Sequence, residues 1–299
     1  MTNSQEKVCL ITGCSSGLGI ALAVDLAQRG HIVIATMRNL SKDADLRAAL
    51  SAAGVQATIE RLDTQDSASI QSVVNTIIAK HQRIDVLINN AGVGCLLSTE
   101  NAPDELISQV LDINVHGVMR CTKAVIPHMR AARQGHVVNI SSLAGQVGQP
   151  FNEIYCASKF AIEGYTEALA AYMTPAFGIN FTSVVAGRLS TDFAANAAKL
   201  TEGTTHSEHE DYKPTRDKYV VGAQQRAQPE MGIIQSAATA AKVVTDCIHL
   251  ETPPIRIFSS KWVEDMCRIK IEPDPTGQRM QQAVIDVFLE NKEVSEAVA

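Results

Sequence analysis

Short apolar runs rich in β-branched residues alternate along this chain with amphipathic stretches of helical period. Such alternation is typical of repeated βα units, in which parallel strands are joined by crossover helices. The runs are almost continuously apolar, which indicates strands covered by helices on both faces. The sequence therefore predicts an α/β fold with a doubly wound, mainly parallel sheet. Seven strands are expected, at residues 8–12, 32–36, 57–62, 86–89, 136–141, 180–185 and 255–258.

We expect residues 1–299 to form a single domain of the Rossmann type, because no linker rich in Pro, Gly or Ser divides residues 1–190. The pattern turns polar from about 194 to 229, without a strand signal before a helix that is expected to begin near Gln235. Insertions of this length are usually functional or disordered. Residues 190–230 are therefore predicted to be a substrate lid, and 259–299 a C-terminal helical extension that also covers the substrate.

Composition narrows the possible partners. Hydrophobic residues make up 45% of the chain and the formal net charge is -6, so a soluble globular protein without a basic face is expected. Nucleic acid and anionic membrane surfaces are therefore not expected partners. Seven cysteines lack CxxC pairs and metal-ligand spacing, which indicates buried thiols in a reducing compartment and no metal site. The absence of a leader pattern and of a membrane-length apolar run favours the cytoplasm.

A turn with three glycines follows the first expected strand, and a helical pattern begins at its end. The glycines are Gly13, Gly17 and Gly19. Glycine lets the backbone approach an anion, and the free N–H groups of a helix N-terminus stabilise a pyrophosphate. The spacing differs from the G-x-G-x-x-G fingerprint, and a tight turn with close helix packing would also require glycine. The turn is a candidate dinucleotide site.

The second expected strand ends at Met37, where many dinucleotide-binding proteins have an acidic residue that binds the ribose of NAD. Here the guanidinium of Arg38 follows instead. A guanidinium suits a 2′-phosphate through charge-assisted, bidentate hydrogen bonds. The sequence therefore favours NADP(H) over NAD(H). The alternative is that Arg38 is a solvated surface residue with no such role.

Tyr155 and Lys159 are four residues apart at the head of a helical pattern that runs from 155 to about 176, so both side chains share one helix face. A free phenol has a pKa of about 10 and is a poor acid or base at neutral pH, whereas a nearby ammonium lowers that pKa. The pair is therefore a candidate acid/base centre. Taken alone, a Tyr-x-x-x-Lys match also fits an exposed aromatic residue beside a surface lysine.

Polar residues follow two further strands at the edge of the sheet where α/β proteins bind their ligands. Ser142 comes after the fifth expected strand, and its hydroxyl is a candidate to hydrogen-bond a substrate carbonyl. Ser141 competes for this role, unless its hydroxyl only bonds to the backbone. The run Asn89-Asn90-Ala91-Gly92 closes the fourth strand, and Asn114 lies in a helical stretch. Each of these residues is ambiguous by itself.

Taken together, these segments resemble the short-chain dehydrogenase/reductase family over nearly the whole chain. The matching features are the Thr-Gly-x-x-x-Gly-x-Gly turn at 12–19, Asp63, the Asn-Asn-Ala-Gly run at 89–92, Asn114, Ser142, Tyr155 and Lys159. The resemblance implies a catalytic tetrad of Asn114, Ser142, Tyr155 and Lys159. In that scheme Tyr155 protonates the carbonyl oxygen while hydride comes from nicotinamide C4, and Ser142 orients that oxygen. Lys159 binds the nicotinamide ribose and lowers the phenol pKa, and Asn114 holds a water that links Lys159 to solvent.

The same resemblance implies a set of cofactor contacts, with Asp63 at the adenine. The implied residues are Thr12, Gly13, Ser15, Ser16, Gly17, Leu18, Gly19, Arg38, Asp63, Asn90, Ala91, Gly92, Tyr155, Lys159, Gly187 and Thr191. One departure concerns the turn after the sixth strand, where family members usually carry proline and this chain has Ala186. That turn loses a fixed φ and is expected to be looser than in other members.

A narrower resemblance is to the branch with 17β-hydroxysteroid dehydrogenase type 1 and the photoreceptor retinol dehydrogenases. It is carried by residues 148–161, 35–39 and 258–260, and by Asp274-Pro275-Thr276-Gly277. The implied function is an NADP(H)-dependent oxidoreductase for a secondary alcohol or ketone, with bulky, apolar molecules such as steroids or retinoids as the candidate substrates. The alternative is a sensor or scaffold that binds NADP(H) without turnover. By resemblance alone, a homodimer or homotetramer is expected.

Overall fold

A computed structural model describes residues 6–201, 210–226, 228, 233–271, 276–279 and 282. Residues 202–209, 227, 229 and 230 of the predicted lid lie outside the described residues, as does much of the predicted C-terminal extension, including Asp274-Pro275. The strands are β1 (Val8–Ile11), β2 (Ile32–Met37), β3 (Thr58–Arg61), β4 (Val86–Asn89), β5 (Gly135–Ile140), β6 (Ile179–Val185), β7 (Leu189–Ser190), β8 (Gln235–Ser236) and β9 (Arg256–Phe258).

Helices follow most of these strands, as the alternating pattern predicts. They are α1 (Gly17–Gln28), α2 (Ala44–Ala52), α3 (Ser67–His81), α4 (Asp104–Leu111), α5 (Gly117–Ala132), α6 (Glu153–Phe177), α7 (Phe193–Thr201), α8 (Lys213–Arg226), α9 (Ala237–Ile248) and α10 (Lys261–Ile271). A π-helical segment, Asp112–His116, joins α4 to α5. Short 3-10 turns lie at Leu40–Lys42, Thr99–Asn101, Leu143–Gly145 and Glu210–Tyr212.

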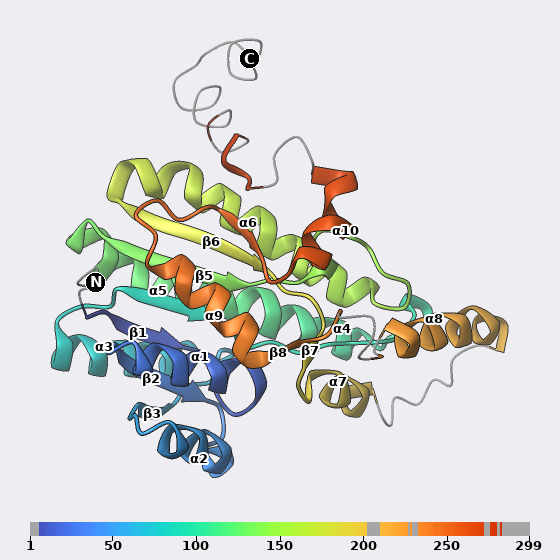
Figure 1. The fold of residues 1–299 in the computed structure, drawn as a ribbon, viewed down its shortest axis with the longest axis horizontal. Helices are drawn as coiled ribbons and strands as arrows, with labels where there is room; N and C mark the ends of the chain where they lie inside the picture. The colour runs from blue at the N-terminus through green and yellow to red at the C-terminus, as the bar shows by residue number, and fades with distance from the viewer. Residues whose placement is uncertain are drawn as a thin grey trace.

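Seven parallel strands form the central sheet, in the order β3-β2-β1-β4-β5-β6-β9. The predicted doubly wound sheet is thereby confirmed, and all seven expected strands are present with ends that differ by a residue or two. The order of the strands reverses between β1 and β4 (Figure 1). In open α/β sheets, ligands bind beyond the carboxyl ends of the strands at such a reversal.

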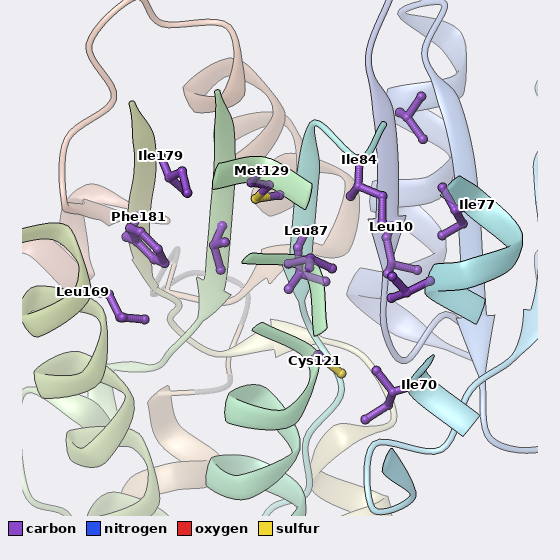
Figure 2. Packing of buried hydrophobic residues seen from close by; sticks show 14 of the residues in the cluster. Leu10, Ile70, Ile77, Ile84, Leu87, Cys121, Met129, Leu169, Ile179 and Phe181 are labelled. Atoms are coloured by element: carbon purple, nitrogen blue, oxygen red, sulfur yellow. The ribbon is translucent and has the colours of Figure 1, made fainter. Parts of the chain in front are cut away.

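Helices cover both faces of the sheet. Residues alternate along each strand, so Leu10 contributes to the core under α3, α5 and α6, while its neighbour Ile11 contributes to the core under α1, α2 and α9. Figure 2 shows the first of these cores, with Phe181 and Leu87 on the sheet and Leu169 of α6 against them. This two-sided burial is the physical reason for the nearly continuous apolar strands.

The first and last helices of one face lie side by side although they are far apart in sequence. Thr245 Oγ1 of α9 donates to Asp25 Oδ2 of α1 at 2.5 Å, and Arg29 Nη2 lies 2.8 Å from Asp246 Oδ1. Beyond their ends, the rings of His31 and His249 stack, with 2.9 Å between their Nε2 atoms. The chain therefore returns, near its last strand, to the helix that follows its first one.

The segments beyond β6 differ from the sequence prediction in detail. A two-residue parallel pair, β7 with β8, lies where no strand was expected, and α9 begins at Ala237 after Ser236 caps it. Two-residue strands carry no periodic signal, so the sequence could not indicate them. The helix α8 extends away from the sheet (Figure 1). Within the described part of the chain, none of the helices has the length and apolar character needed to cross a membrane.

Candidate active site

The glycine turn after β1 is packed backbone against backbone. A Cβ atom on Gly19 would lie 2.3 Å from the carbonyl oxygen of Gly13, and one on Gly13, whose φ is +75°, would lie 2.7 Å from Cα of Ala91. Both distances are far shorter than van der Waals contact, so no larger side chain fits without a backbone shift. The turn after β1 is thus held directly against the turn after β4.

Thr12 and Asn90 fasten these two turns to each other. Thr12 Oγ1 accepts hydrogen bonds from the backbone N–H groups of Asn90 and Ala91, both at 3.0 Å. In return, Asn90 Nδ2 donates to the carbonyl oxygens of Thr12 and Gly13, at 2.9 and 3.0 Å. The predicted cofactor residues on β1 and β4 are therefore brought together, and these side chains fix the shape of the turn.

The N-terminus of α1 is open for an anion. Ser16 precedes the helix without making a side-chain cap, and the first turn carries no acidic residue. The free N–H groups of that turn and the helix dipole favour a negative charge at this point. Thr191 lies against Gly17, since a Cβ on that glycine would meet Thr191 Cγ2 at 3.0 Å. Two more predicted cofactor residues thus meet at the turn.

Arg38 and Asp63 lie after the neighbouring strands β2 and β3. Arg38 directly follows the buried Met37 and is exposed, so its guanidinium is accessible to a ligand. Asp63 is half-buried, and its Oδ1 accepts from the backbone N–H of Gln65 at 3.0 Å. Both positions are at the carboxyl ends of their strands, as predicted.

Asn114 is fully buried in the π-helical segment between α4 and α5. Its Oδ1 accepts from the N–H of Val93 and its Nδ2 donates to the carbonyl of Val93, both at 2.8 Å, and Nδ2 also donates to Ser158 Oγ at 3.1 Å. π-Helical turns recur at functional sites. The Asn114 side chain ties the strand β4 loop to α6, the helix of Tyr155 and Lys159.

Tyr155, Ser142 and Lys159 come together at the carboxyl end of β5. The Ser142 side chain is near enough to the Tyr155 phenol to act on its pKa, and Lys159 Nζ lies 5.7 Å from the centroid of the Tyr155 ring. Lys159 is buried, and its Nζ donates to the carbonyl oxygen of Ile140 at 2.8 Å. The helical spacing of Tyr155 and Lys159 therefore places both groups at one point, as expected.

Burial has the largest effect on the pKa values of Tyr155 and Lys159. It raises the pKa of Tyr155 to about 12, although the Ser142 side chain acts in the opposite direction. It lowers the pKa of Lys159 to about 8, against a raising effect from the Glu163 carboxylate. The expected lowering of the phenol pKa by Lys159 is not found: the pKa of Tyr155 rises instead, because desolvation disfavours the phenolate.

The two serine candidates differ in orientation. Ser142 is half-exposed and its Oγ accepts from the N–H of Ala144 at 3.2 Å, so it caps the short turn that follows β5. Ser141 Oγ is buried and has no hydrogen-bond partner among the described residues. Ser142 also acts on the pKa of the Tyr155 phenol, which favours it over Ser141 as the partner of Tyr155.

Two features of the site carry no sequence signal. The ring of Phe193, in α7, packs against the ring of Tyr155 with 5.7 Å between centroids. Gly187 donates its N–H to Ser259 Oγ at 2.9 Å, and a Cβ on Gly187 would lie 2.6 Å from Val263 of α10. The turn without the usual proline is therefore held by the segment after β9. Nothing short of the fold indicates these contacts, because the partners are distant in sequence.

Comparison with known proteins places this arrangement in context. Residues 7–201 match the family model for short chain dehydrogenases. Bovine (Bos taurus) retinol dehydrogenase 8 is 36% identical over 277 residues, which cover 91% of this chain and 86% of that protein. Human (Homo sapiens) 17-beta-hydroxysteroid dehydrogenase type 1 is 32% identical over 290 residues, covering 93% of this chain and 85% of that protein.

Solved structures share the fold. An actinorhodin polyketide ketoreductase solved with NADPH superposes with a TM-score of 0.69 at 28% identity, covering 83% of this chain and 92% of that one. A short chain dehydrogenase/reductase from Burkholderia phymatum solved in complex with NAD has a TM-score of 0.76 at 22% identity, covering 94% and 97%. The shared fold is therefore found with either dinucleotide, and it does not by itself select the cofactor.

Proposed function

Because this chain belongs to the short-chain dehydrogenase family of oxidoreductases, we propose that it is an NADP(H)-dependent enzyme that interconverts a secondary alcohol and a ketone. The observation that carries the proposal is the meeting of Tyr155, Ser142 and Lys159 beside the glycine turn. A hydroxyl pair next to an ammonium is suited to proton transfer at a carbonyl oxygen. Asn114 supports the group by joining the β4 loop to the helix of Tyr155.

The glycine turn and the start of α1 fit a dinucleotide. A Cβ at Gly13 or Gly19 would clash with backbone, and the uncapped N-terminus of α1 offers free N–H groups to a pyrophosphate. Arg38, exposed after β2, supports NADP(H), because its guanidinium can pair with a 2′-phosphate and no carboxylate replaces it at the strand end. When bound, the nicotinamide supplies or accepts a hydride at C4.

In ketone reduction, Tyr155 donates its phenolic proton to the carbonyl oxygen while Ser142 donates a hydrogen bond to the same oxygen. Burial keeps the phenol protonated at neutral pH by raising its pKa to about 12, which is the state that reduction requires. Lys159, buried below the phenol, stabilises the negative charge that develops on the Tyr155 oxygen after proton transfer. The reverse reaction needs the phenolate and becomes easier as the pH rises.

We propose a bulky, apolar substrate. The ring of Phe193 packs on the Tyr155 ring and is 41% exposed, so it offers an apolar surface beside the phenol. Apolar surfaces next to a few polar groups are typical of sites for large apolar ligands. The similar proteins named for retinol and for 17-beta-hydroxysteroids support the same class of substrate.

Assembly and location complete the proposal. A homodimer or homotetramer is proposed from the family alone. All seven cysteines are buried, and none of them is in a disulfide. Thiols that stay reduced in this number favour a reducing compartment, so the cytoplasm is the proposed location.

The function is tested by replacing Tyr155 with phenylalanine, which removes the hydroxyl and keeps the ring. We expect Tyr155→Phe to bind NADPH about as tightly as the natural protein and to lose turnover by about 10²- to 10⁴-fold. Turnover is followed by the absorbance of NADPH against retinal, steroid ketones and small ketones, and binding by NADPH fluorescence. Turnover that survives the substitution would contradict the acid/base role. Tight NADPH binding without turnover of any carbonyl in the natural protein would favour the sensor alternative.

A further inference from the structure

Charged side chains line one face of α6 and continue into the sheet. Lys159, Glu163 and Glu167 are spaced four residues apart on this helix, so they lie one above the other. Arg256 of β9 reaches the same face, where its Nε lies 3.5 Å from Glu163 Oε2 and its Nη2 pairs with Glu167 Oε1. Two cations and two carboxylates therefore alternate from the candidate active site to the edge of the sheet.

Glu163 is the buried carboxylate of this row, and side chains from two strands hold it. Its residue exposure is 6%, and its Oε1 accepts a hydrogen bond from Ser183 Oγ of β6 at 2.5 Å. Its other oxygen faces Arg256 of β9. A carboxylate bonded in this way has a fixed position, so its charge acts at a fixed distance from the neighbouring ammonium.

Lys159 has few other groups to stabilise its charge. Its Nζ donates to the carbonyl of Ile140, and the titratable groups that face it are the phenol of Tyr155 and the carboxylate of Glu163. Arg256 is on the far side of Glu163. Burial lowers the pKa of Lys159 to about 8 and Glu163 acts against this, so the ammonium is close to losing its proton near neutral pH.

We propose that Glu163 is a positioning residue, which keeps the buried Lys159 ammonium charged and directed at Tyr155. The proposal rests on the proposed function, since it assigns Glu163 a part through Lys159. A structural role alone would require only that Glu163 pair with Arg256 and Ser183. The structure also places the Glu163 carboxylate one helical turn from Lys159, on the side away from the Tyr155 phenol.

The direct test is the titration of Lys159 in the protein without substrate. The full chain carries lysine labelled with ¹³C at Cε, the Lys159 signal is assigned by Lys159→Arg, and chemical shifts are followed from neutral to alkaline pH by NMR. We expect Glu163→Gln to lower the titration midpoint of Lys159 by about one pH unit or more, because an opposite charge nearby shifts a pKa by about that amount. This readout needs no turnover, so it stands even where the proposed reaction fails.

Glu167→Gln is the matched control. It removes the other carboxylate that pairs with Arg256, but lies one turn further from Lys159. Its effect on the Lys159 midpoint should be below about 0.3 pH unit, since Coulomb effects fall with distance. Ser183→Ala, which keeps the carboxylate and removes its hydrogen bond, should give an intermediate shift. Should Glu163→Gln fail to fold, Glu163→Asp keeps the charge and should retain most of the natural midpoint.

The pH profile of turnover gives a second readout. In Glu163→Gln the alkaline limb should begin at a lower pH than in the natural enzyme, with kcat affected more than KM for the ketone. An unchanged Lys159 midpoint in a folded Glu163→Gln protein would overturn the proposal, as would equal shifts in Glu163→Gln and Glu167→Gln. Loss of thermal stability without any change in midpoint would leave Glu163 with a structural role only.

Discussion

The turn of Gly13 and Gly19 packs backbone against backbone, whereas Phe193 of α7 packs its ring against the ring of Tyr155. The first kind of contact admits glycine and almost nothing else, because any Cβ would overlap a backbone atom. The second admits many side chains, since an aromatic ring contacts any apolar group of similar size. On the cofactor side, close packing of backbone atoms therefore restricts the residue type to glycine. On the substrate side, only the size and polarity of the side chain restrict the residue type.

Burial follows the same division. Cys14 in the glycine turn and Leu22 in the helix after it are fully buried, whereas Phe193 in α7 is 41% exposed. The helix α7 has no buried residue. The rings of Tyr212, just before α8, and Tyr219, in α8, contact Phe151. Substitutions in the glycine turn should therefore affect stability and cofactor binding, whereas substitutions in α7 should affect substrate selectivity.

The largest effect is expected from Gly19→Ala. The new Cβ would lie 2.3 Å from the carbonyl oxygen of Gly13 and 2.9 Å from Cα of Cys14, and neither backbone atom can move alone. We expect the free energy of unfolding to fall by about 3 kcal/mol, as for overpacked sites, and the melting temperature by roughly 5–10 °C. Affinity for the dinucleotide should be lost at the same time. Thermal melts with and without NADPH measure both.

Gly148→Ala is the control, because a Cβ there meets no atom within 4 Å. It should change the free energy of unfolding by less than about 0.5 kcal/mol. Comparable losses in the two variants would show that the close packing of the turn is not what makes glycine necessary.

Arg38→Asp should have the next largest effect, and on the cofactor alone. A carboxylate repels the 2′-phosphate of NADPH and can accept from the ribose hydroxyl of NADH. We expect NADPH affinity to fall by about 10- to 100-fold, in line with the loss of charged hydrogen bonds, while NADH affinity holds or rises. Fluorescence titrations with both dinucleotides give the ratio. Equal losses of affinity for NADPH and NADH would show that Arg38 does not recognise the 2′-phosphate.

Phe193→Ala should have the smallest effect on stability, because the ring is 41% exposed and lies on a helix without buried residues. The melting temperature should change by less than about 3 °C. For bulky ketones, KM should rise several-fold, and for small ketones it should stay nearly constant. Lys199→Ala, exposed on the same helix, serves as the control. If Phe193→Ala lowered the melting temperature as much as Gly19→Ala, the proposed difference between α7 and the glycine turn would be contradicted.

The sequence predicted most of the framework because its signals are local. Strands such as β4 show as apolar runs, and the pairing of Tyr155 with Lys159 follows from helical spacing over four residues. The glycine turn was predictable for a related reason. Only glycine fits a turn of this kind, so the residue type itself marks the turn in the sequence. The doubly wound arrangement of the sheet then followed from the alternation of strands and helices.

Contacts between distant segments were not predictable in this way. Phe193 reaches Tyr155, and Arg256 reaches Glu163, across large separations in sequence and with no periodicity to indicate them. The pKa of the phenol was also misjudged in sign, because the expectation counted the nearby charge of Lys159 and could not count burial. Desolvation depends on everything packed around a group, so it becomes known only with the fold.

The union of α1 with α9 has a consequence for a chain that is made from its amino end. Asp25 and Arg29 of α1 find their partners in Thr245 and Asp246, which leave the ribosome only after most of the protein has been synthesised. Until then one flank of α1 stays exposed to the surrounding solution, and the sheet face that β1 shares with α9 is incomplete. Co-translational folding is therefore completed at α1, the helix that is synthesised first. A nascent chain that stops before residue 249 leaves this surface uncovered, and we expect chaperones to bind it.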